Sequence, residues 1–124
     1  MADRYIRPKV TTVSTGLPGR HIWSARHNHV VIDDSSAHGG PGDAPGAGEL
    51  FLAGITGCAT LMMERLARAA DAPLKRVEVS MNGVIDTQAR REGPAVFESA
   101  RLEFIMAGIP QAQAQEFVDT YKRH

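Results

Sequence analysis

The sequence predicts an α+β protein in which an antiparallel sheet packs against one long, buried central helix. Three observations lead to this fold class. Residues 50–63 contain no charged side chain, segments with strand-like patterns lie on both sides of this apolar run, and a second amphipathic helical pattern follows near the end of the chain. With 124 residues, 43% of them hydrophobic, the chain is long enough for one core. We therefore expect residues 1–124 to form a single domain.

The first part of the chain is expected to form three short strands. Residues 9–14 are rich in β-branched side chains, and Gly16 to Gly19 contains the glycines and proline of a turn. Residues 21–25 and 29–33 are expected to be two more short strands, with a bend between them at residues 26–28. Residues 35–48 contain too many glycines and prolines for a regular element. We expect this segment to be a loop that leads into the central helix.

The central helix is expected to begin at Glu49 and to end before Pro73, which cannot continue a helix. Its apolar residues recur at intervals of three and four and therefore share one face. These residues are Phe51, Ile55, Cys58, Ala59, Met62, Leu66 and Ala69. Because other apolar side chains lie between them, we expect the first half of the helix to be buried nearly all round. The uncharged run before Glu64 is too short to span a bilayer.

The last part of the chain is expected to form a hairpin and a helix. Residues 76–81 and 96–106 alternate between apolar and polar side chains, and the polar segment 87–94 connects them. Pro110 is a favoured first residue of a helix. The apolar stripe of this helix consists of Ala114, Phe117, Val118 and Tyr121.

The composition argues against several classes of protein. The 14 Lys and Arg residues balance the 14 Asp and Glu residues, so no basic excess favours nucleic-acid binding. The N-terminus lacks the apolar segment of a signal peptide. A single cysteine excludes a disulfide within the chain as given and is typical of a reducing compartment. We therefore expect a cytoplasmic protein that binds neither nucleic acid nor membranes.

Cys58, the only cysteine, lies in the middle of the uncharged run. A lone thiol there is either a small core side chain or a nucleophile held in a dry pocket. Gly54 and Gly57 would let another helix approach closely, and they would also leave room for a substrate beside the thiol. The residues alone leave both interpretations open.

The order of these elements resembles that of the OsmC/Ohr family, the osmotically inducible and organic-hydroperoxide-resistance proteins. The resemblance covers nearly the whole chain, and its most specific parts are the Gly-Gly-Pro-Gly segment after His38 and the helix motif from Glu49 to Cys58. It implies the OsmC-like fold, in which an intertwined homodimer encloses long central helices between sheets and carries its active sites at the subunit interface. It also implies a thiol peroxidase. We expect no cofactor.

The resemblance implies roles for three residues. Cys58 corresponds to the peroxidatic cysteine of the family. An arginine from the N-terminal hairpin stabilises the thiolate in the family, and Arg20 is the first candidate for it, with Arg26 the second. This arginine pairs with a glutamate at the helix start, where Glu49 is the only acidic residue. Each also has a simpler interpretation, Arg20 as a solvated turn residue and Glu49 as a favourable charge at a helix N-terminus.

Two features depart from the family pattern. Most hydroperoxide reductases of the family carry the glutamate ten positions before the cysteine, where this chain has Gly48. Glu49 comes one residue later, which rotates a helical side chain by about 100° and is more similar to the OsmC-like branch with poorly defined substrates. The family also has a resolving Cys-Pro pair after the last helix, where this sequence ends at His124. Either the sequence is truncated before that pair, or an external thiol reduces the oxidised cysteine.

The sequence therefore predicts a peroxidase that reduces organic hydroperoxides, and hydrogen peroxide, through Cys58 with the help of Arg20 and Glu49. Its expected partners are the hydroperoxide, an external thiol or dithiol reductant and a second copy of the chain. The alternative is a non-catalytic OsmC-like protein that binds a small ligand or a partner, with Cys58 as a buried structural thiol. His27 and His29 would share a face of one strand, but no third metal ligand follows from the spacing, so no metal site is expected.

Overall fold

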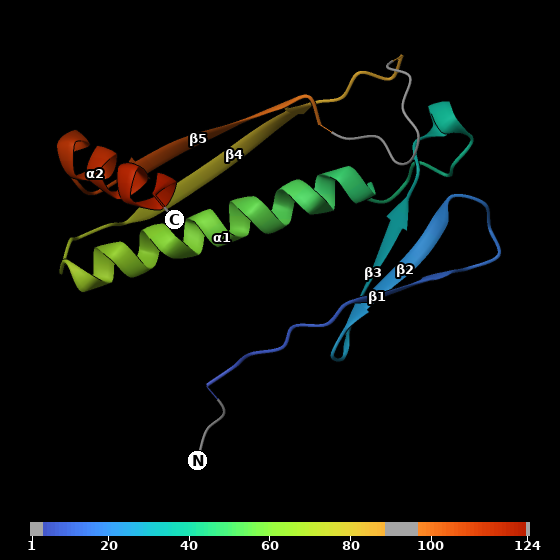
Figure 1. Ribbon diagram of the computed structural model, residues 1–124, viewed down its shortest axis with the longest axis horizontal. Helices are drawn as coiled ribbons and strands as arrows, with labels where there is room; N and C mark the ends of the chain where they lie inside the picture. Colours follow the sequence, from blue (N-terminus) through green and yellow to red (C-terminus); the bar gives the residue numbers. More distant parts are fainter. Residues whose placement is uncertain (1–3, 89–96, 124) are drawn as a thin grey trace. The chain divides into compact units, whose positions relative to one another are not determined.

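The computed structural model describes residues 4–88 and 97–123 (Figure 1). The chain divides into an N-terminal unit, Met1–Phe51, and a C-terminal unit, Leu52–His124, with the boundary inside the long helix α1. Both units contain antiparallel strands, so the predicted α+β class is confirmed. The described strands form two separate sheets in place of the single sheet expected, because each strand pairs with its neighbours along the chain.

The N-terminal unit contains a three-stranded antiparallel sheet in the order β1-β2-β3. Its strands are β1 (Thr11–Ser14), β2 (Arg20–Ala25) and β3 (Asn28–Asp33), which confirms the three predicted strands with a shorter first one. In the register of β2 and β3, Arg20 lies opposite Asp33. Opposite residues of an antiparallel pair project from the same face of a sheet, so these two side chains can meet.

This sheet has an exposed apolar row on the same face. Ile22 lies opposite both Val13 and Val31 in the register, and the three side chains are 38%, 60% and 39% exposed, respectively. Among the described residues 4–51, Asp33 alone is buried. The N-terminal unit therefore has no apolar core of its own within the described chain.

The segment predicted to be a loop contains two pieces of helix. Residues Ser36–His38 form a short 3₁₀ helix, η1, which ends at Gly39 with φ 85°. One turn of 3₁₀ helix needs few hydrogen bonds: the N–H of His38 donates to the carbonyl of Ser35, and the N–H of Gly39 donates to the carbonyl of Ser36. The helix α1 also begins at Ala47, two residues before the predicted start, so the expectation of a loop over 35–48 is wrong in these two places.

The C-terminal unit consists of most of α1, a hairpin and a second helix. Its elements are α1 (Ala47–Ala69), β4 (Arg76–Val84), β5 (Ser99–Ala107) and α2 (Gln111–Lys122). The pairing of β4 with β5 confirms the predicted hairpin. Residues 89–96, which include most of the predicted connection and the predicted start of the second strand, lie outside the described chain. Pro110 precedes α2 as its N-cap rather than as its first residue.

The core of the C-terminal unit forms where α1, α2 and the hairpin pack together. Its buried residues are Met63, Ala67 and Phe117, and the apolar stripe predicted for α2 faces them. The rings of Phe104 and Tyr121 contact edge to face, with 5.8 Å between their centroids. The partly buried side chains that pack against this core are Met62, Leu66, Ala72, Leu74, Val77, Phe104, Met106, Ile109, Val118 and Tyr121.

The buried face of α1 agrees only in part with the predicted one, since Ala59 is buried and Met62 and Leu66 pack against the core as expected. Ala59, Met63 and Ala67, spaced by four residues, are buried, whereas Phe51 and Cys58 are exposed. Nearly every residue between 50 and 63 is apolar, so periodicity could not decide which side of the helix faces the core. The expectations that Cys58 is buried and that the first half of α1 is covered all round are therefore wrong for the single chain.

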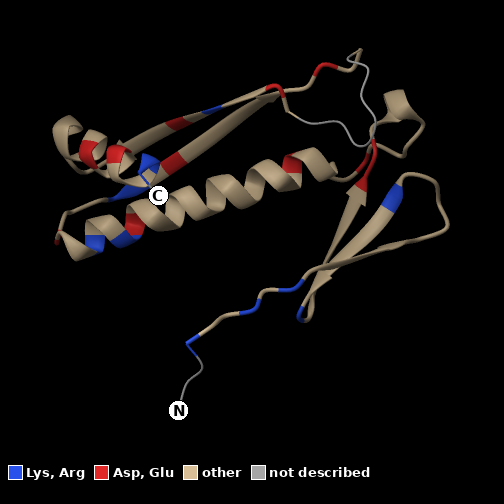
Figure 2. Cartoon of the chain, viewed as in Figure 1, with Lys and Arg blue, Asp and Glu red and all other residues tan. Residues whose placement is uncertain are grey.

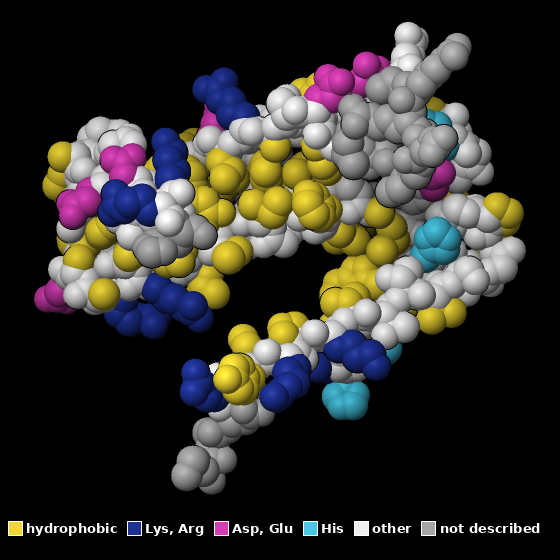
Figure 3. All heavy atoms as spheres, viewed as in Figure 1, with side chains coloured by type: hydrophobic (Ala, Val, Ile, Leu, Met, Phe, Trp, Pro, Cys, Tyr) yellow, Lys and Arg dark blue, Asp and Glu magenta, His cyan; other side chains and the backbone are white. Residues whose placement is uncertain are grey.

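The exposed part of α1 is long and apolar. Charged residues lie toward both ends of the helix and not along its middle (Figure 2). An 18-residue window has a mean hydropathy of 1.3 with only 17% of it buried, so by length and composition α1 could cross a membrane. The uncharged run 50–63 alone is too short to span a bilayer, but α1 extends beyond this run at both ends. The core helix of a soluble protein meets the same criteria of length and hydropathy as a membrane-spanning helix. Hydrophobic side chains also gather on the surface of the molecule seen in Figure 3.

Candidate functional site

Cys58 lies near the middle of α1, on the side of the helix that points away from the core. Successive helical residues are about 100° apart, so Cys58 lies about 140° around the helix from buried Met63. It shares its side with Phe51, Gly54 and Leu61, a row that we call the thiol stripe. Phe51 and Leu61 are 61% and 45% exposed. A side chain added at Gly54 would meet nothing within 4 Å, so the surface beside the thiol is open.

The thiol stripe contains no ionisable group other than Cys58 itself. A surface of this composition becomes a dry environment only when another apolar surface covers it. The stripe can therefore offer a thiol and apolar contacts, but the charge that would stabilise a thiolate has to come from other residues.

Arg20, the first residue of β2, forms a two-point ion pair with the carboxylate of Asp33. Arg20 Nε donates to Asp33 Oδ1 and Arg20 Nη2 donates to Asp33 Oδ2, each over 2.7 Å. Asp33 Oδ2 also accepts the backbone N–H groups of Asp43 and Ala44. We call these four residues the Asp33 cluster. Arg20 is therefore not the solvated turn residue of the simpler interpretation.

The Asp33 cluster favours the charged forms of both side chains. The hydrogen bond from Arg20 lowers the pKa of Asp33 from 3.8 to about 2, with help from the N–H groups of Ala44 and Asp43 and against the effect of burial. The hydrogen bond to Asp33 in turn raises the pKa of Arg20. The carboxylate is thus ionised at every pH at which such a protein would work.

Glu49 caps the N-terminus of α1. Its Oε1 accepts the backbone N–H of Gly46, the residue before the helix, over 2.9 Å. A glutamate at the third helical position that binds back to the N-cap N–H is one half of a capping box. The geometry matches the simpler interpretation of Glu49, and the carboxylate has a structural partner within its own unit.

The structure thus groups the predicted site residues by unit. Arg20 and Glu49 belong to the N-terminal unit, and the stretch from Asp43 to Gly46 leads from the Asp33 cluster to the Glu49 cap. Cys58 belongs to the C-terminal unit. The second arginine candidate, Arg26, is exposed and sits in the β2–β3 turn with φ 56°.

Asp33 is the residue that the sequence reasoning missed. A signal for it was nevertheless present in the sequence. An arginine at the start of one strand and an aspartate at the end of the next become direct neighbours once a short hairpin turn joins the two strands.

The histidines do not form a metal site in the described chain. His27 lies in the turn before β3, so His27 and His29 do not share a strand. His29 Nδ1 is 2.6 Å from the hydroxyl of Ser24. Within residues 4–88 and 97–123, no group of three His, Cys, Asp or Glu residues could hold a metal ion.

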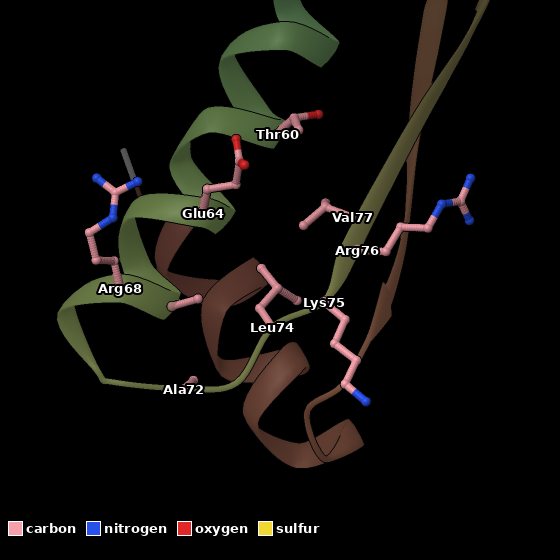
Figure 4. A pocket seen from close by; sticks show the side chains of 9 residues that line it. Thr60, Glu64, Arg68, Ala72, Leu74, Lys75, Arg76 and Val77 are labelled. Carbon is pink, nitrogen blue, oxygen red and sulfur yellow. The ribbon is translucent and has the colours of Figure 1, made fainter.

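A hollow of about 270 Å³ lies in the C-terminal unit between α1 and the start of β4 (Figure 4). Thr60 and Glu64 of α1 line it on one side, and Leu74 and Val77 line it on the other. Cys58 is not among its lining residues. It comes two residues before Thr60, which corresponds to a rotation of about 200° around the helix, so Cys58 lies on a different side of α1. This hollow is therefore not the site of the thiol.

Comparisons with known proteins agree with this architecture. Residues 40–124, which include α1 and Cys58, match the family model of the OsmC-like proteins. No curated protein is significantly similar in sequence.

Solved structures share the fold at low sequence identity. An OsmC-like protein of Mycoplasma pneumoniae superposes with a TM-score of 0.79 and 15% identity, over 93% of this chain and 79% of that one. An organic hydroperoxide resistance protein OsmC of Legionella pneumophila gives a TM-score of 0.73 and 17% identity, over 94% and 82%.

A Vibrio cholerae protein assigned to organic hydroperoxide resistance, with captopril bound in one of its active sites, gives a TM-score of 0.63 and 22% identity, over 97% and 79%. Because the family model covers well over half of the sequence and the fold agrees along nearly its whole length, the chain belongs to the family of OsmC-like proteins.

Proposed function

We propose that this protein is a thiol-dependent peroxidase that reduces organic hydroperoxides, and hydrogen peroxide, through Cys58. The observation that carries the proposal is the position of the only thiol, on an uncharged apolar stripe of the helix that the OsmC-like family model covers. The names of two structural neighbours, which refer to organic hydroperoxide resistance, support the substrate class. Apolar surroundings would favour organic hydroperoxides over hydrogen peroxide.

The proposed reaction begins with the thiolate of Cys58. Its sulfur attacks the distal oxygen of the hydroperoxide, an S–O bond forms, and the O–O bond breaks. The alkoxide that leaves takes up a proton to become the alcohol, and Cys58 becomes a sulfenic acid. Arg20 provides N–H groups for the negative charge during this step. Glu49 would assist only if its carboxylate formed an ion pair with Arg20 in addition to capping α1.

An external thiol completes the proposed cycle, because the sequence contains one cysteine. The first thiol condenses with the sulfenic acid and releases water, which leaves a mixed disulfide on Cys58. A second thiol, or the other half of a dithiol, attacks this disulfide and regenerates the Cys58 thiolate. Such reductants are those of a reducing compartment, so the proposal includes a cytoplasmic location.

The proposal includes a homodimer. The thiol stripe and the apolar row of Val13, Ile22 and Val31 are exposed in the single chain, and contiguous exposed apolar side chains are typical of interfaces. A second copy that covers α1 would give Cys58 the dry surroundings that the single chain lacks.

A non-catalytic binding protein is the second candidate, and one observation favours it. The two side chains expected to assist the thiol already have structural partners, since Arg20 binds Asp33 and Glu49 caps α1. In that case Cys58 would be a dimer-interface side chain that does not react with peroxides.

The two candidates differ in what one equivalent of cumene hydroperoxide does to the native protein. The peroxidase proposal expects Cys58 to gain one oxygen atom by mass spectrometry, with consumption of the hydroperoxide, and the Cys58→Ser protein to do neither. The matched variant Leu61→Ala, on the same stripe, should slow the reaction with cumene hydroperoxide more than that with hydrogen peroxide. If Cys58→Ser consumes hydroperoxide at the wild-type rate, the peroxidase proposal is wrong.

A further inference from the structure

The Asp33 cluster is a feature that the chemistry of Cys58 does not by itself require. Asp33 is 2% exposed and is the only buried residue in the described part of its unit, residues 4–51. Burial of a carboxylate costs free energy unless hydrogen bonds replace its water, and buried ion pairs contribute little net stability. Besides any effect on stability, the cluster constrains the orientation of Arg20.

Four donors hold the Asp33 carboxylate in place. Two come from Arg20, over 2.7 Å each, and two are the backbone N–H groups of Asp43 and Ala44, over 3.0 and 2.9 Å. The backbone of β3 is tied to the same loop, since the N–H of Asp33 donates to the carbonyl of Pro45 over 3.0 Å. Backbone donors cannot rotate away as side chains do. The carboxylate is thus fixed to the loop before α1, and its two-point contact fixes the plane of the guanidinium.

The same geometry determines which N–H donors of the Arg20 guanidinium can still bind another ligand. A guanidinium has five N–H donors, and Asp33 takes the one on Nε and one on Nη2. Asp43 Oδ2 lies 3.5 Å from Nη2, but this carboxylate belongs to a side chain that is 83% exposed. The two N–H groups of Nη1 therefore point away from Asp33. Because the carboxylate neutralises much of the charge, the effect of Arg20 on another anion depends on the direction of these N–H groups.

We propose that Asp33 is the positioning residue of Arg20: its loop-bound carboxylate fixes the guanidinium and leaves the Nη1 edge as the part of Arg20 that can serve the anion formed in the proposed reaction of Cys58. This inference rests on the proposed peroxidase function. Asp33 acts through Arg20 and touches neither the thiol nor the peroxide.

The test measures the rate constant for sulfenic acid formation at Cys58 by cumene hydroperoxide, across a range of pH, in the full-length protein. The variants are Asp33→Asn, Arg20→Ala, their double mutant and Arg20→Lys. Glu78→Gln is the matched control, because it removes a carboxylate from an exposed ion pair with another arginine, Arg76, outside the Asp33 cluster. Circular dichroism and the fluorescence of Trp23, the only tryptophan, verify that each variant is folded.

We expect Asp33→Asn and Arg20→Ala each to lower the rate by about tenfold or more, and the double mutant to be no slower than Arg20→Ala, because the two residues act as one unit. Both single variants should shift the pH profile alike, which a purely structural role would not do. Glu78→Gln should stay within about twofold of the wild type. Arg20→Lys should also form sulfenic acid slowly, because an ammonium keeps the charge but cannot make the two-point contact.

Three results would overturn the inference while leaving the peroxidase function intact. They are a wild-type rate for folded Asp33→Asn, for Arg20→Lys or for Arg20→Ala. Should Asp33→Asn fail to fold, Arg20→Lys decides the question with Asp33 in place. Failure of the proposed function has a different signature, since the wild-type protein would then form no sulfenic acid at all.

Discussion

Arg20 and Asp33 lie opposite each other in the register of β2 and β3, and two hydrogen bonds of 2.7 Å join their side chains. The same carboxylate binds the loop that leads into α1. One acidic side chain therefore connects the hairpin, the arginine expected to assist the thiol and the approach to the helix that carries the thiol. The predictions below test the contacts that hold these parts in place.

The first prediction concerns the acid stability of the N-terminal unit. The pKa of Asp33 is lowered from 3.8 to about 2 by its hydrogen bond with Arg20, so its ionisation stabilises the folded form fully above about pH 4, and the contribution is lost as the pH falls toward 2. The fluorescence of Trp23 on β2 should report this loss. Asp33→Asn should remove this pH dependence and be less stable at neutral pH. Equal acid transitions in the two proteins would contradict the assignment.

The second prediction concerns the core of the C-terminal unit. Met63 is fully buried, so Met63→Ala should lower the free energy of unfolding by about 2–5 kcal/mol, through lost burial and the cavity left behind. Leu61→Ala, on the exposed side of the same helix, is the control and should change it by less than about 1 kcal/mol when the protein is monomeric. Chemical denaturation measures both. A larger loss for Leu61→Ala at all protein concentrations would show that the assigned phase of α1 is wrong.

The third prediction concerns the start of α1. Glu49→Ala removes the acceptor for the N–H of Gly46 and should lower the free energy of unfolding by about 0.5–1 kcal/mol. Glu49→Gln keeps an acceptor that a capping box can use, so it should lose less. If both variants keep their stability but lose the reaction with hydroperoxide, the carboxylate serves catalysis rather than the cap.

The fourth prediction concerns the close approach of Gly40 to Asp34, the residue that follows β3. A Cβ added there would overlap the backbone carbonyl of Asp34, which cannot rotate out of the way as a side chain could. Gly40→Ala should therefore displace the segment that follows β3 and lower the stability of the N-terminal unit, as seen by Trp23 fluorescence. Gly54→Ala is the control, because its Cβ would meet nothing within 4 Å. Equal stability of the two variants would contradict the close packing at Gly40.

The sequence was most informative where patterns are local. The positions of strands and helices were predictable because their signals lie within a few residues of each element. These signals are the β-branched runs of the strands, Pro73 after α1 and the apolar stripe of α2. The buried side of α1 was not, since an apolar helix has no polar face to mark its phase. The contact between Arg20 and Asp33 depends on the register of a hairpin. The role of Glu49 depends on a cap at Gly46, three residues before the predicted start of the helix.

The scarcity of buried apolar residues in the N-terminal unit also has a thermodynamic consequence. The heat-capacity change of unfolding comes mainly from apolar surface that becomes exposed. A unit whose only buried described residue is a carboxylate should open with little change in heat capacity. In calorimetry, the curvature of stability with temperature would then come from the Met63 core and from whatever covers α1. A monomer and an assembled form of this protein should therefore differ more in heat capacity than in secondary structure.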